Sequence, residues 1–166
     1  NALAQKQKIT SVYTTLADKQ CKTIELNVEE SGYYRGRCPG TGGYKLELIE
    51  GDLRQTINVI TPGKKKYELS LWTNVSSAFS AVGDKAEWRV LTKKGKITPL
   101  ALIVRFNASE NPDNPNQMTS YLVVSKITAK NVCVTDIIKP KTNANAEAQK
   151  LADESANKAC KTVDDR

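Results

Sequence analysis

The chain has 166 residues, a length typical of a single domain, and its 39% hydrophobic and 26% charged residues are typical of a globular protein. No apolar run approaches the roughly 18 residues that a membrane-spanning helix needs. Histidine is absent, which excludes Ser-His-Asp and Cys-His catalysis and imidazole metal ligands. The net charge of +7 permits anionic partners, but lysines greatly outnumber arginines, which disfavours sequence-specific DNA reading.

The first half of the chain predicts a run of strands. Residues 1–8 are polar, and we expect them to be disordered. Segments rich in β-branched and aromatic residues, or alternating apolar and polar residues, then predict strands. These strands are 9–16, 21–26, 33–38, 44–49 and 53–60. Turns are expected at 29–32 and 50–52, and a glycine-rich loop at 39–43.

The second half predicts further strands and one helix. The apolar segment 69–72 is expected to be a strand end packing onto Phe79 and Val82, and Gly83 and Asp84 to form a turn. Later strands are expected at 88–91, 100–106, 121–127 and 132–138, with a connecting turn at 93–96 and a loop at 107–117.

The C-terminal segment 144–160 predicts a helix. Alanines and one leucine recur at helical spacing on one face, and Asn143 is the expected N-cap. The face is only weakly apolar, so packing alone would hold the helix loosely. We therefore predict a single α+β domain over 9–163, mainly β: an antiparallel sheet or sandwich of about eight strands with a C-terminal helix packed on it.

Four cysteines stand at 21, 38, 133 and 160, an even number without the close Cys-x-x-Cys pairs of zinc or redox sites. Three disulfide connectivities are possible, and unpaired buried cysteines are an alternative. We favour Cys21–Cys38 and Cys133–Cys160, because each closes a short loop within one half of the chain. Two disulfides indicate an oxidising compartment, so we expect the mature part of a periplasmic or secreted protein.

Several motifs occur together in this chain: Cys38-Pro-Gly-Thr-Gly-Gly-Tyr44, Glu50-Gly-Asp-Leu-Arg54, Tyr121-Leu-Val-Val-Ser-Lys-Ile127, and Cys133 followed by an alanine-rich helix that ends at Cys160. Taken together they resemble a family of small exported bacterial proteins with no assigned activity. The resemblance covers nearly the whole chain. It implies export and the cysteine framework, and it implies no chemistry.

The first candidate site combines tyrosines and arginines around the glycine-rich loop. Tyrosine and arginine are enriched at protein interfaces, so this set is the candidate surface for a protein partner. Its members are Tyr33, Tyr34, Arg35, Arg37, Tyr44 and Arg54. The alternative is that they are ordinary residues of exposed strand faces. The loop itself could cradle an anion through its N–H groups, or could be a turn that needs positive φ.

The second candidate site is a set of lysine-rich turns that could bind a polyanion: Lys64, Lys65, Lys66, Lys93, Lys94 and Lys96. Such turns also simply keep sheet proteins soluble. A third possibility is a histidine-free hydrolase that uses two of the carboxylates Glu47, Glu50, Asp52 and Glu87.

The sequence favours a non-catalytic exported binding module, which could inhibit a secreted enzyme. The alternatives are an envelope-associated protein that binds a polyanion and the carboxylate hydrolase. We expect no cofactor and no metal site. The expected partner is a protein or an anionic envelope component rather than a specific nucleic acid.

Overall fold

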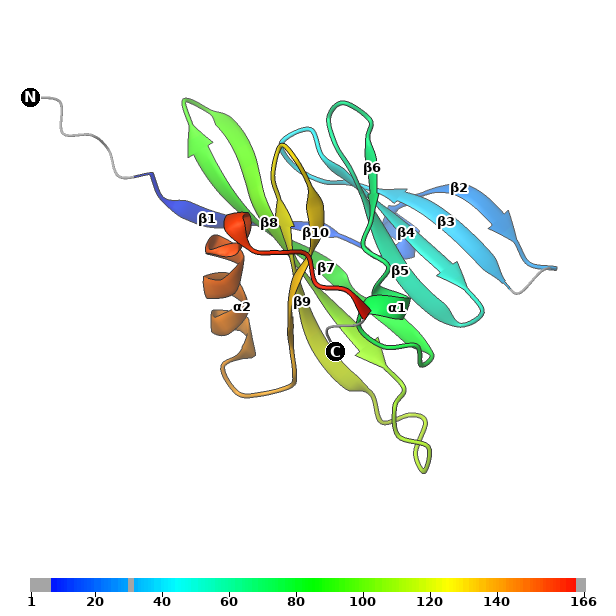
Figure 1. The fold of residues 1–166 in the computed structure, drawn as a ribbon. Coiled ribbons are helices and arrows are strands. Elements are labelled where there is room, and N and C mark those ends of the chain that lie inside the picture. Colours follow the sequence, from blue (N-terminus) through cyan, green and yellow to red (C-terminus); the bar gives the residue numbers. More distant parts are fainter. Residues whose placement is uncertain (1–6, 30–31, 164–166) are drawn as a thin grey trace, which may run out of the picture.

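The structure is a β-sandwich with a helix on one side (Figure 1). It is a computed structural model that describes residues 7–29 and 32–163. Within these residues, two antiparallel sheets of five strands each face one another. Sheet A contains, in spatial order, β1 (Ile9–Thr15), β7 (Ser80–Lys93), β8 (Lys96–Ala108), β9 (Thr119–Ile127) and β10 (Val132–Ile138). Sheet B contains β2 (Lys22–Asn27), β3 (Tyr33–Cys38), β4 (Lys45–Gly51), β5 (Arg54–Ile60) and β6 (Lys66–Glu68). The helical elements are η1 (Asp18–Gln20), α1 (Leu71–Asn74), α2 (Ala144–Asp153) and η2 (Ser155–Asn157).

The main core lies between the sheets, because alternate side chains of each strand point inward. Trp88 and Phe106 from sheet A are fully buried against Leu46 and Ile57 from sheet B. The indole Nε1–H of Trp88 donates a hydrogen bond to Thr14 Oγ1 at 2.8 Å, so this large apolar ring also has its polar atom satisfied.

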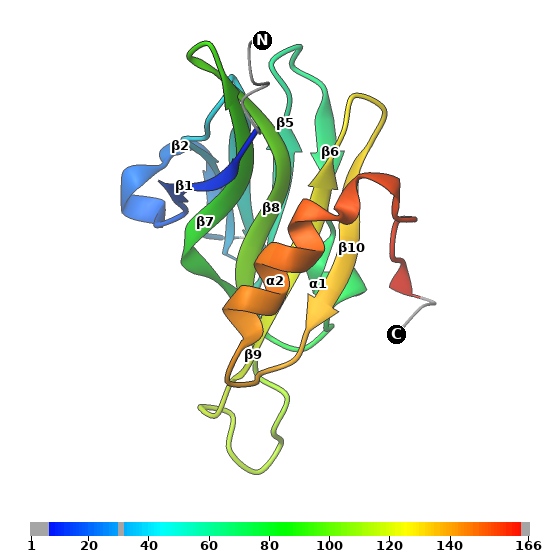
Figure 2. The ribbon, with the colours of Figure 1, turned by 90° about the vertical axis from the view of Figure 1, so that its left-hand side faces the viewer.

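A second, smaller core explains the continuous apolar runs in β8 and β9. These strands are buried on both faces, because α2 covers the face of sheet A that points away from sheet B (Figure 2). Ala148 and Ala152 of α2 are buried there, and their small side chains let the helix lie close to the sheet. The sheet contributes Ala101, Ile103, Leu122, Val124 and Ile138.

Polar and covalent links reinforce this weakly apolar helix. Arg89 of β7 donates two hydrogen bonds to the Asp153 carboxylate, at 2.8 and 2.9 Å, and such a paired geometry is stronger than a single contact. The Cys133–Cys160 disulfide joins β10 to the segment that follows η2, and the second disulfide joins Cys21 to Cys38. The predicted cysteine pairing is therefore confirmed. Among the described helices, none is long and apolar enough to cross a membrane.

Several predicted strand boundaries were wrong. The described residues form two five-stranded sheets rather than about eight strands, and the short edge strand β6 was not predicted. The apolar segment at 69–72 turns into α1 instead of a strand end, and the N–H of Leu71 donates to Thr56 Oγ1 at 2.8 Å. The predicted turn at 83–84 is an irregular part of β7, where the register with β8 shifts between Val82 and Ala86. The loop expected at 107–117 begins later, because β8 continues to Ala108.

The C-terminal helix was predicted in the right place but too long. It ends at Asp153 instead of 160, and η2 and an extended segment then lead to Cys160. The spacing of Ala156 and Ala159 predicts that they lie on the apolar face of the helix, but both are exposed. The side chain of Asn143 makes no capping hydrogen bond. The disordered segment expected at 1–8 lies outside the described residues except for Gln7 and Lys8, which precede β1.

Candidate anion-binding surface

Loops that are distant in sequence meet at one end of the sandwich. The turns β3–β4, β5–β6, β7–β8 and β9–β10 all lie at the top in Figures 1 and 2. The β3–β4 loop packs tightly among them: a Cβ placed on Gly42 would come within 2.7 Å of Pro99 Cδ, and one on Gly43 within 3.0 Å of Pro62 Cγ. Both glycines have positive φ, of 61° and 85°. These contacts support the interpretation of this loop as a packed turn rather than an open anion cradle.

This end of the molecule, which we call the lysine end, is densely basic. All of its lysines are exposed: Lys8, Lys45, Lys64, Lys65, Lys66, Lys93, Lys94, Lys96 and Lys130. The segments 39–45, 61–66, 92–98 and 128–131 contain no aspartate or glutamate. The fold therefore brings together the two lysine-rich turns that the sequence singled out. It adds Lys8, Lys45 and Lys130, which lie outside the two lysine-rich turns in the sequence.

A buried carboxylate adjoins the lysine end on the outer face of sheet B. Glu47 of β4 is 0% exposed, although strand alternation places it on the face opposite the main core. Its Oε1 accepts hydrogen bonds from Lys66 Nζ at 2.9 Å and from Asn58 Nδ2 at 3.1 Å. Its Oε2 lies 3.3 Å from Arg35 Nη1 and 3.7 Å from Arg37 Nη2. We call Glu47, Asn58, Arg35, Arg37 and Lys66 the Glu47 cluster.

The electrostatics of this cluster favour the ionised carboxylate. Burial by itself opposes ionisation, but hydrogen bonds from Lys66 and Asn58, with the charges of Lys66 and Arg35, outweigh it and lower the pKa of Glu47. One buried negative charge thus faces three cations. Their side chains remain 27% exposed for Arg35, 39% for Arg37 and 41% for Lys66, so solvent or a ligand can reach them.

The cluster and the lysine end are continuous through the strand register. Lys45 on β4 and Lys66 on β6 both pair with Ile60 of β5. On the same face, the next row along the strands contains Lys22, Arg37, Glu47, Asn58 and Glu68. The basic surface therefore extends from the loops onto the outer face of sheet B.

The six tyrosines and arginines expected around the glycine-rich loop do not form one surface. Arg35 and Arg37 lie on the outer face of sheet B, and strand alternation places Tyr33 on that face too. Tyr34 packs against the main core with its hydroxyl buried and without a hydrogen-bond partner, and Tyr44 packs 6.3 Å from Trp88, centroid to centroid. Burial of Tyr44, with a smaller contribution from Tyr67, raises the pKa of its hydroxyl.

Tyr33 and Arg54 lie at the other end of sheet B from the lysine end. Arg54 pairs with Gly51 beside the β4–β5 turn, and Tyr33 pairs with Asn27 at the end of β2. Arg54 Nε donates to the Ser77 carbonyl at 2.7 Å, and its guanidinium stacks 4.8 Å from the Phe79 ring centroid. These contacts give Arg54 a local structural role.

No family model, curated protein or solved structure matches this chain.

The carboxylates considered for hydrolysis lie in different places. Glu47 is on the outer face of sheet B, whereas Glu87 belongs to β7 of sheet A. Glu50 accepts a hydrogen bond from Gln55 at 3.4 Å, and Asp52 pairs with Arg54 at 2.9 Å. Within residues 7–29 and 32–163, no three histidine, cysteine, aspartate or glutamate residues are grouped as metal ligands.

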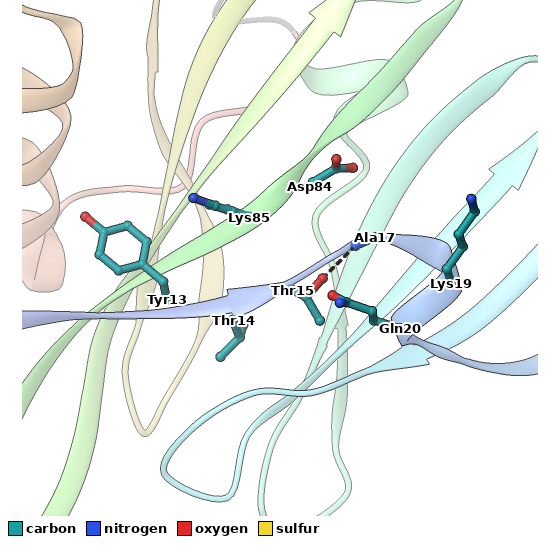
Figure 3. A pocket seen from close by; sticks show the side chains of 8 residues that line it. All are labelled: Tyr13, Thr14, Thr15, Ala17, Lys19, Gln20, Asp84 and Lys85. Atoms are coloured by element: carbon teal, nitrogen blue, oxygen red, sulfur yellow. Dashed lines mark hydrogen bonds between the residues drawn. The ribbon is translucent and has the colours of Figure 1, made fainter.

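A shallow hollow of about 490 Å³ lies where β1 runs into η1 beside β7 (Figure 3). The amine of Lys85 points toward Tyr13 in this view, whereas Asp84 points away from it. An adjoining hollow of about 360 Å³ reaches Glu87, whose carboxylate accepts hydrogen bonds from Ser11 at 2.5 Å and Gln149 at 2.7 Å. Asp84 lines both hollows, and Glu87 in the second is already held by Ser11 and Gln149.

Proposed function

We propose that this protein is a non-catalytic exported binding module that holds an anionic polymer at its lysine end. The observation that carries the proposal is the gathering of exposed lysines from separate hairpin loops onto one end whose loop segments contain no acidic residue. Lysine-rich turns that served only solubility would not need to converge. The proposed partner is an envelope component with repeated phosphate or carboxylate groups.

The chemistry of lysine supports a polymer rather than a small, specific ligand. Its ammonium is a compact charge on a flexible stem, so a field of lysines tolerates many spacings of negative charge. Binding of this kind releases counterions and weakens steeply as salt rises. The two disulfides support the exported location, because such bonds persist in oxidising compartments.

The test compares two triple variants that carry the same net charge. Substituting Lys64, Lys94 and Lys130 with serine removes three charges from the lysine end, lowering the net charge from +7 to +4. Substituting the exposed Lys19, Lys139 and Lys150 with serine lowers it equally elsewhere. Binding to fluorescent polyphosphate is measured by anisotropy between about 50 and 200 mM salt.

We expect the lysine-end variant to bind about tenfold more weakly at low salt, with a shallower salt dependence, because each lost phosphate contact releases one counterion fewer. The matched control should change by less than about threefold. Equal losses in the two variants would show that only net charge matters, and the proposal would fail.

A further inference from the structure

The Glu47 cluster has an arrangement that its role in stability does not explain. A buried charge is balanced by a partner of opposite charge and by hydrogen bonds to its remaining polar atoms. Glu47 has Asn58 and three cations, of which Lys66 alone makes a close charged hydrogen bond, at 2.9 Å. Arg35 and Arg37 lie farther from the carboxylate, at 3.3 and 3.7 Å. Three cations therefore share one buried carboxylate.

The arginines of the cluster also retain unused donors. A guanidinium has five N–H groups in a fixed fork, and only one nitrogen of Arg37 is paired with Glu47. Its Nε is buried without a hydrogen-bond partner. Arg35 makes one further contact, with the half-exposed Glu25 at 3.5 Å, a distance and exposure at which an ion pair is weak.

Without Glu47, the cations would repel one another and their long side chains would spread into solvent. The buried carboxylate holds three charged heads around a common point, next to Lys45 and the rest of the lysine end. Fixing donors before a ligand arrives reduces the entropy lost on binding. Arginine forks match the paired oxygens of phosphate and carboxylate groups.

We infer that the Glu47 cluster is a preformed receptor for one oxyanion group of the bound polymer, with Glu47 acting as the positioning residue for Arg35, Arg37 and Lys66. This inference rests on the proposed function: the lysine end attracts the polymer, and the cluster binds one of its groups with defined geometry. The ligand chemistry is an oxyanion with two oxygens available to an arginine fork, carried as phosphate or as carboxylate.

The decisive variant is Glu47→Gln, because general charge attraction and positioning by Glu47 predict opposite changes in affinity for the polymer. The substitution raises the net charge from +7 to +8, so general electrostatic attraction would strengthen binding. Loss of the positioning carboxylate would weaken it. The control Glu154→Gln, at an exposed position on the chain after α2, makes the same change in charge without touching the cluster. Affinity for polyphosphate and for polyglutamate is measured side by side, so that the phosphate and carboxylate sources are compared.

We expect E47Q to bind at least one polymer about tenfold more weakly, since it loses oriented charge-assisted hydrogen bonds, while E154Q binds as well as or better than the unmodified protein. The polymer that loses more affinity identifies the group the cluster prefers. Equal strengthening by E47Q and E154Q would overturn the inference. That result would leave the proposed function intact, since the latter depends on the separate lysine-end variants.

A second pair of variants keeps the inference testable if E47Q does not fold. Arg37→Lys preserves the charge of the cluster but removes the fork, and Arg54→Lys makes the same change at the far end of sheet B. Folding of every variant is verified by circular dichroism. Weaker binding by R37K alone supports the inference, and equal binding by R37K and R54K contradicts it.

Discussion

Glu47 is the residue at which simple strand alternation is most misleading. The pattern Leu46-Glu47-Leu48 predicts an outward-facing, solvated glutamate, and the side chain does face away from the main core. It is nevertheless fully covered, because Arg35, Arg37 and Lys66 fold their long side chains over it. A polar residue on an outer strand face can therefore be buried by its own ion-pair partners.

The lowered pKa of Glu47 makes stability depend on pH. The group binds its proton less readily in the folded state than in the unfolded state, where its usual pKa is 4.5. Its contribution to the free energy of unfolding is therefore complete above about pH 5 and is lost as the pH falls through the folded-state pKa. We expect the unmodified protein to exceed E47Q in stability by about 1–3 kcal/mol at pH 7.

Urea unfolding of both proteins between pH 7 and pH 3 measures this difference. The difference in free energy of unfolding between the two proteins should become smaller toward pH 3, because protonated Glu47 is then neutral like glutamine. A gap that stays constant across this range would contradict the assignment of Glu47 as an ionised, buried group.

At the scale of elements, α2 shows how a weakly apolar helix can be held in place. Its buried surface consists mainly of alanine, which gives little hydrophobic stabilisation per residue but allows close approach to sheet A. The Arg89–Asp153 pair and the Cys133–Cys160 disulfide supply the links that a larger apolar face would otherwise provide.

Close packing predicts that α2 will not tolerate larger side chains on its buried face. Ala148→Leu should lower the free energy of unfolding by about 1–3 kcal/mol, because Ala148 is fully buried against the sheet. The control Ala146→Leu lies on the same helix but is exposed, and should change stability by less than about 0.5 kcal/mol. Chemical denaturation of both variants tests this, and a similar loss at the two positions would argue against tight helix–sheet packing.

At the scale of the whole molecule, three layers are held together by two cores and two distant covalent links. One disulfide joins Cys21, just before β2, to the end of β3, and the other joins the C-terminal segment to sheet A. Charge is also distributed unevenly over the molecule. The lysine end is opposite the β8–β9 loop, which contains Glu110 and Asp113 (Figure 1).

Removal of either disulfide should destabilise the whole domain. The bridges close loops with sequence separations of 17 and 27, which correspond to about 3 and 3.5 kcal/mol in the chain-entropy model. Replacing both cysteines of one pair with serine, followed by urea unfolding, measures each contribution separately. Unchanged stability in either double variant would show that its bridge does not constrain the unfolded chain.

The sequence by itself determined the features that depend on local chemistry. Period-two alternation located most strands, alanine spacing located the helix, and the short loops between cysteines indicated the pairing. Only the tertiary structure decided which side chains meet. Tyr34 and Tyr44 pack against the core, and Arg54 lies at the end of sheet B away from the lysine end. Lys45 and Lys130 lie beside the lysine-rich turns. Strand register and loop packing bring together residues that are far apart in sequence, and no local pattern in a single sequence specifies them.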